Sequence, residues 1–287
     1  MLNIDVIKPG LFTSVQDGGR KGFAFYGIPA SGYMDVTAAH IANMLVGNKK
    51  NSPLLEMNFV GGVFKFNSDS VIAITGADMQ ASLNGDLCKT YQTLIIKKGE
   101  VLHFKNTIDG ARSYLAIQGA WKIPEIYGSK STFSIGNNAG LACAVIKATD
   151  RIKIQTNLDA HKTPLVIWPQ IPKYNLIKTI HITKGPEHVL LKNPKLLSSS
   201  FSISRQSDRM GAILDGPVME TQLQESFTSK YLFPGMIQCT PSGKLIVVLQ
   251  DGQTTGGYPR VGIISKKELD RFNQLQPGMD FNFSVED

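Results

Sequence analysis

The sequence predicts a mostly β protein with a few short helices, and three observations support this prediction. It holds 27 glycines while 18% of its residues are charged, a balance typical of β-rich folds with many tight turns. Between residues 62 and 119, short runs of alternating apolar and polar residues are separated by turn signals. One of these signals is Asn84-Gly85, a strong indication of a β-hairpin. Short strands at this spacing favour a barrel or sandwich over a βαβ sheet.

The expected strands before residue 120 are short. They cover residues 63–66, 70–75, 79–83, 93–96, 101–104 and 112–118. The four residues Lys97-Lys98-Gly99-Glu100 predict a second hairpin, which would join 93–96 to 101–104.

Two helices are predicted from capping residues and apolar spacing. The first spans 36–46, where Asp35 is placed to cap the N-terminus ahead of an apolar stripe. The second spans 266–276, where Ser265 and Glu268 have the spacing of a capping box and a Pro-Gly pair follows.

The chain is long enough for two domains, and a polar stretch with several prolines at 157–172 is the expected junction. We therefore predict an N-terminal domain over 1–160 and a C-terminal domain over 161–287, whose segments can interleave at the termini. Gln16-Asp17-Gly18 recurs as Gln250-Asp251-Gly252, which weakly supports two related halves.

Charge, cysteine use and motif content argue against several functions. The net charge is +7, but the lysines are scattered and no nucleic-acid-binding motif accompanies them, so no nucleic-acid partner is expected. Three distant cysteines predict reduced thiols and a reducing compartment. Without a signal peptide or a long apolar run, the protein is expected in the cytoplasm, without a membrane. The histidines lack metal-binding spacing, so no metal site is predicted, and 128–132 fails the phosphate-loop pattern.

A glycine-rich segment at 13–22 is the first candidate binding element. It places Gln16, Asp17 and Arg20 around glycines that allow close approach of a ligand to the backbone. Arg20 is suited to grip a carboxylate or a phosphate. The alternative, which the residues favour slightly, is a turn pinned by an Asp17–Arg20 pair.

A second candidate element, at 250–260, directly follows an apolar strand, and here the functional interpretation is favoured over a plain hairpin loop. Its candidate binding residues are Gln253, Thr254, Thr255, Gly256, Gly257 and Tyr258. Arg209, within 204–211, belongs either to an anion site or to a structural salt bridge, and the sequence does not distinguish the two. The catalytic residues stay unassigned, because five acidic residues are equally placed to act as general base: Asp17, Asp35, Glu56, Asp208 and Asp251.

Several motifs occur in order along nearly the whole chain. They include Gln16-Asp17-Gly-Gly-Arg20, Gly27-Ile-Pro29, Met34-Asp35, Ser207-Asp208-Arg209-Met-Gly211 and, most specific of all, Gln253-Thr-Thr-Gly-Gly-Tyr-Pro259. Together they resemble the allophanate hydrolase subunit 2 family. One departure is Ile213, where the family pattern has an arginine. If that arginine holds an anionic group, its loss alters substrate preference or reduces activity, and if it pairs internally, little changes.

The resemblance implies two tandem cyclophilin-like β-barrel domains and a multi-subunit enzyme. In the 5-oxoprolinase branch of the family, this chain corresponds to the C subunit, and its partners are the KipI-like B subunit and the A subunit. ATP, shared with or supplied by these partners, drives the opening of 5-oxo-L-proline to L-glutamate. One alternative is a biotin-dependent carboxyltransferase component acting on urea or a related amide, with biotin on a partner. Another is a non-catalytic KipA-like regulator that antagonises a kinase inhibitor.

Overall fold

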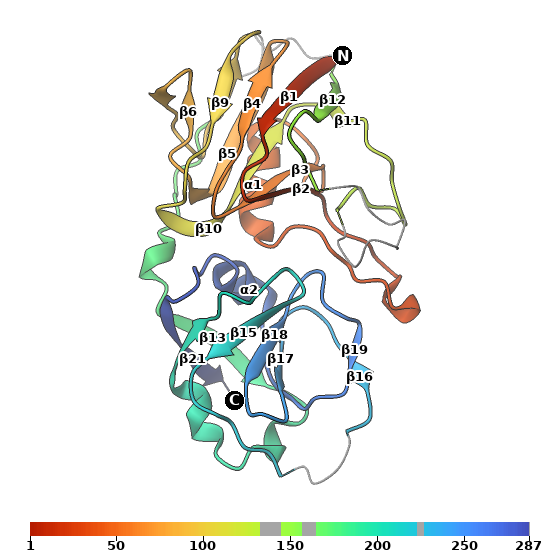
Figure 1. Cartoon of the computed structure of the whole chain (residues 1–287), viewed down its shortest axis with the longest axis vertical. Helices are drawn as coiled ribbons and strands as arrows, with labels where there is room; N and C mark the ends of the chain where they lie inside the picture. The colour runs from red at the N-terminus through yellow and green to blue at the C-terminus, as the bar shows by residue number, and fades with distance from the viewer. Residues whose placement is uncertain (133–144, 157–164, 223–226, 287) are drawn as a thin grey trace. The chain divides into compact units, whose positions relative to one another are not determined.

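The computed structural model describes residues 1–132, 145–156, 165–222 and 227–286 (Figure 1). The chain forms two compact units: unit 1 contains Met1–Arg20 and Ser31–Tyr174, and unit 2 contains Lys21–Ala30 and Asn175–Asp287. The sequence predicted a domain boundary between residues 160 and 161, whereas the structure divides the chain after Tyr174. Residues beyond 164 hydrogen-bond into unit 1, where Thr93 N donates to Val166 O and Trp168 N donates to Tyr91 O.

Unit 1 is built from two antiparallel sheets. The seven-stranded sheet has the order β11 (Ala120–Trp121), β12 (Arg151–Gln155), β1 (Leu2–Lys8), β4 (Val63–Phe66), β9 (Val101–His103), β6 (Ser82–Leu83) and β7 (Asp86–Leu87). The five-stranded sheet has the order β2 (Phe12–Gln16), β3 (Leu54–Asn58), β10 (Asp109–Ile117), β5 (Ser70–Asp78) and β8 (Thr93–Ile96).

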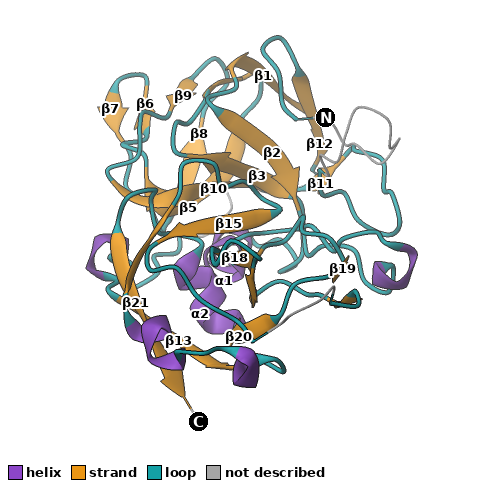
Figure 2. Cartoon of the chain, turned by 60° about the horizontal axis from the view of Figure 1, so that its bottom comes forward, coloured by secondary structure: helices purple, strands orange, loops and turns teal. Residues whose placement is uncertain are grey.

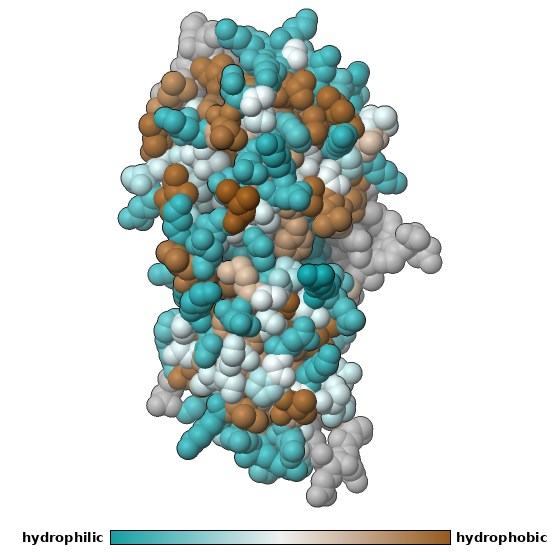
Figure 3. Space-filling view, turned by 60° about the vertical axis from the view of Figure 1, so that its left-hand side comes forward, coloured by the Kyte–Doolittle hydropathy of each residue, from teal (hydrophilic) through white to brown (hydrophobic). Residues whose placement is uncertain are grey.

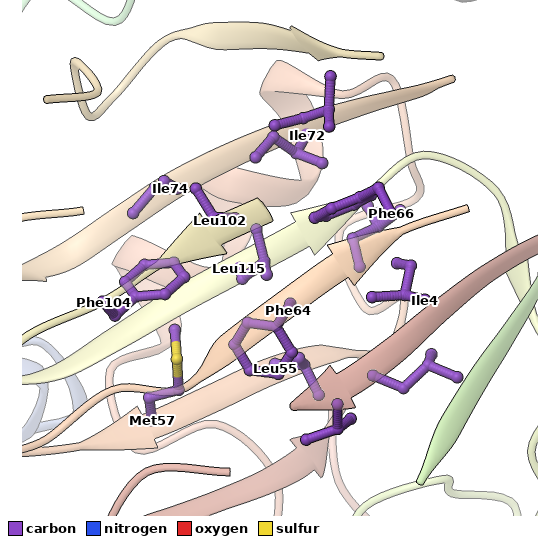
Figure 4. Packing of buried hydrophobic residues seen from close by; sticks show 14 of the residues in the cluster. Ile4, Leu55, Met57, Phe64, Phe66, Ile72, Ile74, Leu102, Phe104 and Leu115 are labelled. Carbon is purple, nitrogen blue, oxygen red and sulfur yellow. The ribbon is translucent and has the colours of Figure 1, made fainter. Parts of the chain in front are cut away.

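The main hydrophobic core of unit 1 takes side chains from both sheets. Phe64 and Phe66 of one sheet, and Leu55 and Leu115 of the other, are fully buried in one cluster. Figure 4 shows these side chains pointing into the same interior. Alternate residues of a strand face opposite sides of a sheet, so this core uses one face of each sheet.

Helix α1 (Val36–Leu45) covers the other face of the five-stranded sheet. Its apolar residues pack with Tyr114 and Ala116 of β10, which explains why β10 is buried on both faces. The Asp35 side chain accepts from Ala38 N at 2.9 Å and caps the helix, as predicted.

The two hairpin predictions had different outcomes. Strands β6 and β7 pair across Asn84-Gly85, where both residues have positive φ, so this hairpin is confirmed. The hairpin predicted between 93–96 and 101–104 is wrong, although both strands form. Strand β8 pairs with β5, whereas β9 pairs with β4 and β6, so the connection crosses from one sheet to the other. Which strands β8 and β9 pair with depends on the face that each of them buries, and the residues of the connecting turn do not determine this.

Unit 2 contains a closed barrel. Its order is β13 (Thr179–Lys184), β20 (Arg260–Ile264), β17 (Met236–Cys239), β18 (Leu245–Val248), β15 (Gly211–Asp215), β14 (Ser200–Ile203) and β21 (Asp280–Glu286). A separate ribbon pairs β16 (Lys230–Tyr231) with β19 (Thr255–Gly256). Short 3₁₀ turns occur at Ala24–Tyr26 (η1), Tyr174–Leu176 (η3), His188–Leu190 (η4) and Pro194–Ser198 (η5). Strands dominate the regular structure (Figure 2), which confirms the mostly β prediction. The tandem arrangement of two barrels stays a prediction, since the strands of unit 1 form two sheets.

Helix α2 (Lys266–Phe272) begins where predicted and ends before residue 276. Ser265 Oγ accepts from Glu268 N and caps its start. After Phe272 the backbone tightens, because Gln274 N donates to Arg271 O and Leu275 N donates to Phe272 O, three residues back. Leu275 is thereby buried in unit 2 without a further helical turn.

Two of the three cysteines are described, and both are free thiols. Cys239 is buried and Cys88 is half-buried, while Cys143 lies outside the described residues. Burial raises the pKa of the Cys239 thiol to about 11, which keeps it protonated and unreactive near neutral pH. On the face in Figure 3, hydrophobic residues are interspersed with hydrophilic ones.

Candidate functional site

Asp17 is the centre of a buried hydrogen-bond cluster in unit 1. Its carboxylate accepts from Ser129 Oγ at 2.6 Å, Lys130 N at 2.6 Å, Ser131 Oγ at 2.7 Å and Gly19 N at 2.9 Å. Ser131 Oγ also accepts from Asp17 N at 2.9 Å. Asp17 thus fastens the glycine-rich segment 16–20 to a segment more than a hundred residues later in the chain.

The neighbours of Asp17 contact the same later segment. Gln16 is fully buried and donates from Nε2 to Ser14 Oγ at 2.9 Å and to Thr132 O at 3.4 Å. The Arg20 guanidinium is also buried and donates to Ser131 O. The structure therefore brings Gln16, Asp17 and Arg20 together, and these contacts hold the segment in place.

Segment 128–132, which only partly resembles a phosphate-binding loop, does not fit a nucleotide phosphate. The Ser129 and Ser131 hydroxyls and the Lys130 N–H donate to the Asp17 carboxylate. The Lys130 ammonium donates to Trp121 O at 3.0 Å and lies 3.7 Å from the Glu125 carboxylate. These donors, which a phosphate would need, already bind an acceptor of the same chain, so the segment does not form a phosphate-binding loop.

Arg209 forms a buried ion pair in unit 2. Its Nε donates to Asp251 Oδ2 at 2.7 Å, and the two side chains are 7% and 5% exposed. Asp251 N also donates to Arg209 O at 2.9 Å. Of the two alternatives left open for Arg209, these contacts support the structural salt bridge, which fixes the start of loop 250–260.

Loop 250–260 presents polar side chains outward on a buried backbone. Gln253, Thr255 and Tyr258 are exposed, whereas Thr254 and Gly256 are buried. Thr254 O accepts from Leu232 N at 2.8 Å, and Thr255 pairs with Tyr231 across the β16–β19 ribbon. Gly257 lies close to Phe227 O, where a Cβ would come within 3.2 Å. The loop therefore offers an amide, a hydroxyl and a phenol from a fixed backbone.

Gly256 lies against two amide side chains. A Cβ at this position would lie 2.9 Å from both Gln238 Nε2 and Gln253 Nε2, and 2.7 Å from a Leu232 methyl. Gln238 is buried, and its Nε2 donates to Tyr258 O at 3.4 Å. Gln238 was not among the predicted site residues, because its strand position looks like ordinary barrel interior.

Replacing Gly256 by alanine is expected to push aside the ends of the Gln238, Gln253 and Leu232 side chains. Because these flexible ends can shift, the free energy of unfolding should fall by about 1 kcal/mol, the low end of the usual cost of overpacking. The Gly257→Ala variant is the matched control, since its nearest contact would be a milder 3.2 Å. Thermal unfolding of both variants measures the difference. Equal stability of Gly256→Ala and wild type would contradict the close packing of this loop.

Arg260 and Glu187 clamp the far end of the loop, and this pair was not predicted. The Arg260 guanidinium donates to both Glu187 oxygens at 2.7 and 2.6 Å, and to Tyr231 O at 3.1 Å. Hydrogen bonds from Arg260 lower the pKa of the Glu187 carboxyl. The clamp joins the 185–190 turn, strand β16 and the loop. A basic residue ending the polar loop was visible in the sequence, but its distant acidic partner was not.

Unit 1 also buries a cluster of tyrosines around Asp35. Tyr114 Oη accepts from Asp35 N at 2.7 Å, and Tyr174 Oη donates to Asp35 Oδ2 at 3.3 Å. Tyr91 Oη lies 3.2 Å from Tyr174 Oη and accepts from Gly76 N at 3.0 Å. Burial raises the pKa of all three phenols, and that of Tyr91 reaches about 12. The cluster was missed because its members are far apart in sequence.

Alkaline pH is expected to destabilise unit 1. An unfolded tyrosine ionises near pH 10, whereas folded Tyr91 ionises near pH 12, so above pH 10 the unfolded state loses its proton first. The free energy of unfolding is therefore fully retained below pH 10 and falls as pH rises towards 12. Urea unfolding at several pH values measures this fall, and Tyr91→Phe should reduce it. A flat profile up to pH 12 would contradict the prediction.

The other general-base candidates have defined places. Asp208 is exposed and accepts from Met210 N at 2.7 Å and Gly211 N at 3.2 Å, which closes a turn. Glu56 is fully buried in unit 1 and accepts from Met34 N at 2.9 Å. Ile213 lies on the barrel strand β15 between buried Ala212 and Leu214, so its side chain faces the opposite, outer side.

Among the described residues, no group of three or more His, Cys, Asp or Glu side chains is arranged to hold a metal ion. No helix among them combines the length and apolar character needed to cross a bilayer. Gln16, Asp17 and Arg20 belong to unit 1, whereas Arg209 and residues 253–258 belong to unit 2.

The fold and these elements define a β-barrel protein that presents a polar, glycine-rich loop on a rigid scaffold. The chain belongs to the carboxyltransferase domain family, whose model for subdomains A and B matches residues 26–285. This confirms the family resemblance inferred from the motifs.

Relatives place the chain among components of enzyme complexes. It is 33% identical to the C subunit of 5-oxoprolinase from Escherichia coli (strain K12), over 98% of this chain and 90% of that protein. It is 30% identical to urea amidolyase of Saccharomyces cerevisiae, over 98% of this chain and 16% of that protein.

Solved structures show the same fold. A structure of TTHA0988 matches 99% of this chain and 56% of that chain, with a TM-score of 0.89 and 29% identity. The Kluyveromyces lactis urea carboxylase matches 99% of this chain and 27% of that chain, with a TM-score of 0.89 and 26% identity. The chain thus spans about half of one solved relative and about a quarter of the other.

Proposed function

We propose that this chain is one component of an ATP-dependent 5-oxoprolinase, which opens 5-oxo-L-proline to L-glutamate together with the A and B subunits of that enzyme. One observation carries the proposal. The similarity extends over 90% of the E. coli 5-oxoprolinase C subunit, whereas it covers 16% of the yeast urea amidolyase. A match to nearly the whole of the bacterial subunit supports the same task as part of a complex.

In this proposal, the outward side chains of loop 250–260 bind the lactam. A lactam offers one carbonyl acceptor and one N–H donor, and the Gln253 amide supplies both complementary groups. Thr255 and Tyr258, which are also exposed, add hydroxyls from the same loop. These groups position the substrate and stabilise charge on its carbonyl oxygen, and they form no covalent intermediate. In this proposal Arg20 does not contact the substrate. Its guanidinium donates to Ser131 O and so holds the glycine-rich segment 16–20 in place.

ATP is assigned to the sister subunits in this proposal. The phosphate-loop-like segment at 128–132 has its donors bound to Asp17, which argues against a phosphate cradle there. ATP hydrolysis supplies the driving force for opening the lactam, while this chain contributes binding and orientation of the amide.

The test is ATP hydrolysis by the chain purified with its A and B sister subunits, with and without 5-oxoproline. A 5-oxoproline-dependent rate with formation of glutamate is expected. The Gln253→Ala variant should raise KM for 5-oxoproline about tenfold, the loss of roughly one hydrogen bond. The matched control is Gln222→Ala, an exposed glutamine of unit 2 outside the loop. No stimulation by 5-oxoproline in the complete complex would refute the proposal and direct attention to regulation.

A carboxyltransferase role is the second candidate, and the family model together with the urea carboxylase fold favours it. The same loop would then face the ureido group of a biotin carried by a partner and the amide acceptor. A streptavidin blot of the complex purified from cells tests this alternative. A biotinylated partner and bicarbonate-dependent carboxylation of urea would support it, and a blank blot would contradict it.

A further inference from the structure

Two adjacent aromatic side chains in unit 2 are almost fully exposed. Phe25 is 93% exposed and Tyr26 is 72% exposed, both within the 3₁₀ turn η1 (Ala24–Tyr26). Large aromatic side chains gain free energy from burial, and Phe25 is the most exposed large hydrophobic side chain among the described residues. The pair plays no part in the site described above.

The turn holds the two rings in a fixed arrangement. Tyr26 N donates to Phe23 O and Gly27 N donates to Ala24 O, each at 3.0 Å. Gly27 ends the turn with a φ of 75°, a conformation that favours glycine. The two rings meet edge to face, with centroids 5.6 Å apart and an interplanar angle of 87°. A preorganised aromatic pair loses little conformational entropy when a partner covers it.

The one charged residue of segment 21–30 is basic. It is Lys21, which is exposed, and no acidic residue occurs between Asp17 and Asp35 in the sequence. A surface that complements this segment therefore has an apolar pocket of aromatic size, with an acidic group placed to meet Lys21.

We propose that the Phe25–Tyr26 turn is the anchor by which this chain binds the KipI-like sister subunit, through an apolar pocket of that subunit. This inference rests on the proposed function, which requires such a sister subunit. Two comparisons support a polypeptide partner: the E. coli relative is one subunit of its enzyme, and the solved TTHA0988 chain continues well beyond the 56% that this chain matches. Aromatic anchors of this kind carry most of the binding energy in protein interfaces.

The experiment measures the affinity of the purified chain for the purified KipI-like sister subunit by calorimetry. The double variant Phe25→Ser, Tyr26→Ser should raise Kd at least about thirtyfold, the effect of losing a hot spot. The matched control is Leu176→Ser, Val189→Ser, which changes two apolar residues of unit 2 that are 72% and 79% exposed. The control should bind within about threefold of wild type, since scattered surface apolar residues contribute little.

Circular dichroism should show that both double variants fold, because exposed side chains contribute little to stability. Hydrogen exchange of residues 21–30 in the unaltered chain is an independent readout and should slow when the KipI-like sister subunit is added. Wild-type affinity in the Phe25→Ser, Tyr26→Ser variant, or unchanged exchange, would overturn the proposal. Self-association of the wild-type chain that this variant abolishes would instead assign the turn to a second copy, and would also overturn it.

The outcome is separable from that of the proposed function. Tight binding of the KipI-like sister subunit through this turn without 5-oxoproline turnover would leave the surface established and the activity refuted. 5-oxoproline turnover by the complex, together with unchanged affinity of the double variant for the KipI-like sister subunit, would support the activity and refute the proposed surface.

Discussion

Replacing Asp251 by alanine is expected to lower the free energy of unfolding of unit 2 by about 3–5 kcal/mol, because it leaves the Arg209 charge buried without its carboxylate partner. The two side chains are 7% and 5% exposed, so water compensates little for the loss. Hydrogen exchange of the barrel strands β15, β17 and β18 measures the effect. Both tryptophans, Trp121 and Trp168, lie in unit 1, so tryptophan fluorescence reports separately on that unit.

The double variant Arg209→Met, Asp251→Leu is the control. Replacing both members of a buried ion pair by apolar residues of similar size is often neutral, so most of the lost stability should return. If Asp251→Ala alone were as stable as wild type, the ion pair would not be what holds the start of loop 250–260.

The Asp17→Ala variant is expected to destabilise unit 1 by about 3 kcal/mol or more, since several buried donors lose their acceptor at once. The side chains of Ser129 and Ser131 and the backbone N–H groups of Gly19 and Lys130 all donate to this carboxylate. Urea unfolding followed by tryptophan fluorescence measures the change in unit 1.

A milder variant separates hydrogen bonding from charge. Asp17 Oδ1 accepts three of the four hydrogen bonds, and Lys130 N alone donates to Oδ2. Asp17→Asn retains one oxygen acceptor, so it should lose less stability than Asp17→Ala. Equal losses in the two variants would show that the charge, and not the number of acceptors, carries the stabilisation.

Local sequence rules predicted the local structure well. Asp35 and Ser265 cap the helices that they were expected to cap, because an N-cap depends on residues three positions apart. Asn84-Gly85 formed its hairpin since both residues adopt the positive φ that such a turn requires. The hairpin predicted at residues 97–100 was wrong, because a polar turn that contains glycine can also connect strands of two different sheets.

The candidate site could be predicted in part. The sequence indicated which segments are unusual, but the roles of their residues depend on partners that are distant in sequence. Asp17 accepts hydrogen bonds from Ser129 and Ser131, and Arg260 forms an ion pair with Glu187. These partners are too far apart in the sequence for a local pattern to predict them. Within loop 250–260, the packing of Gly256 against Gln238 of strand β17 likewise joins residues that are distant in sequence.

The pairing of β1 with β12 has a consequence for how the protein is made. Leu2 lies opposite Ile154, so strand β1 has no neighbour on that side until residues 151–155 are synthesised. Residues 21–30 can pack into unit 2 only later, because the rest of that unit starts at residue 175. During synthesis, apolar strand edges and the Phe25–Tyr26 pair are therefore exposed in the nascent chain. Production of this protein should thus be sensitive to translation speed and to chaperones that shield early segments.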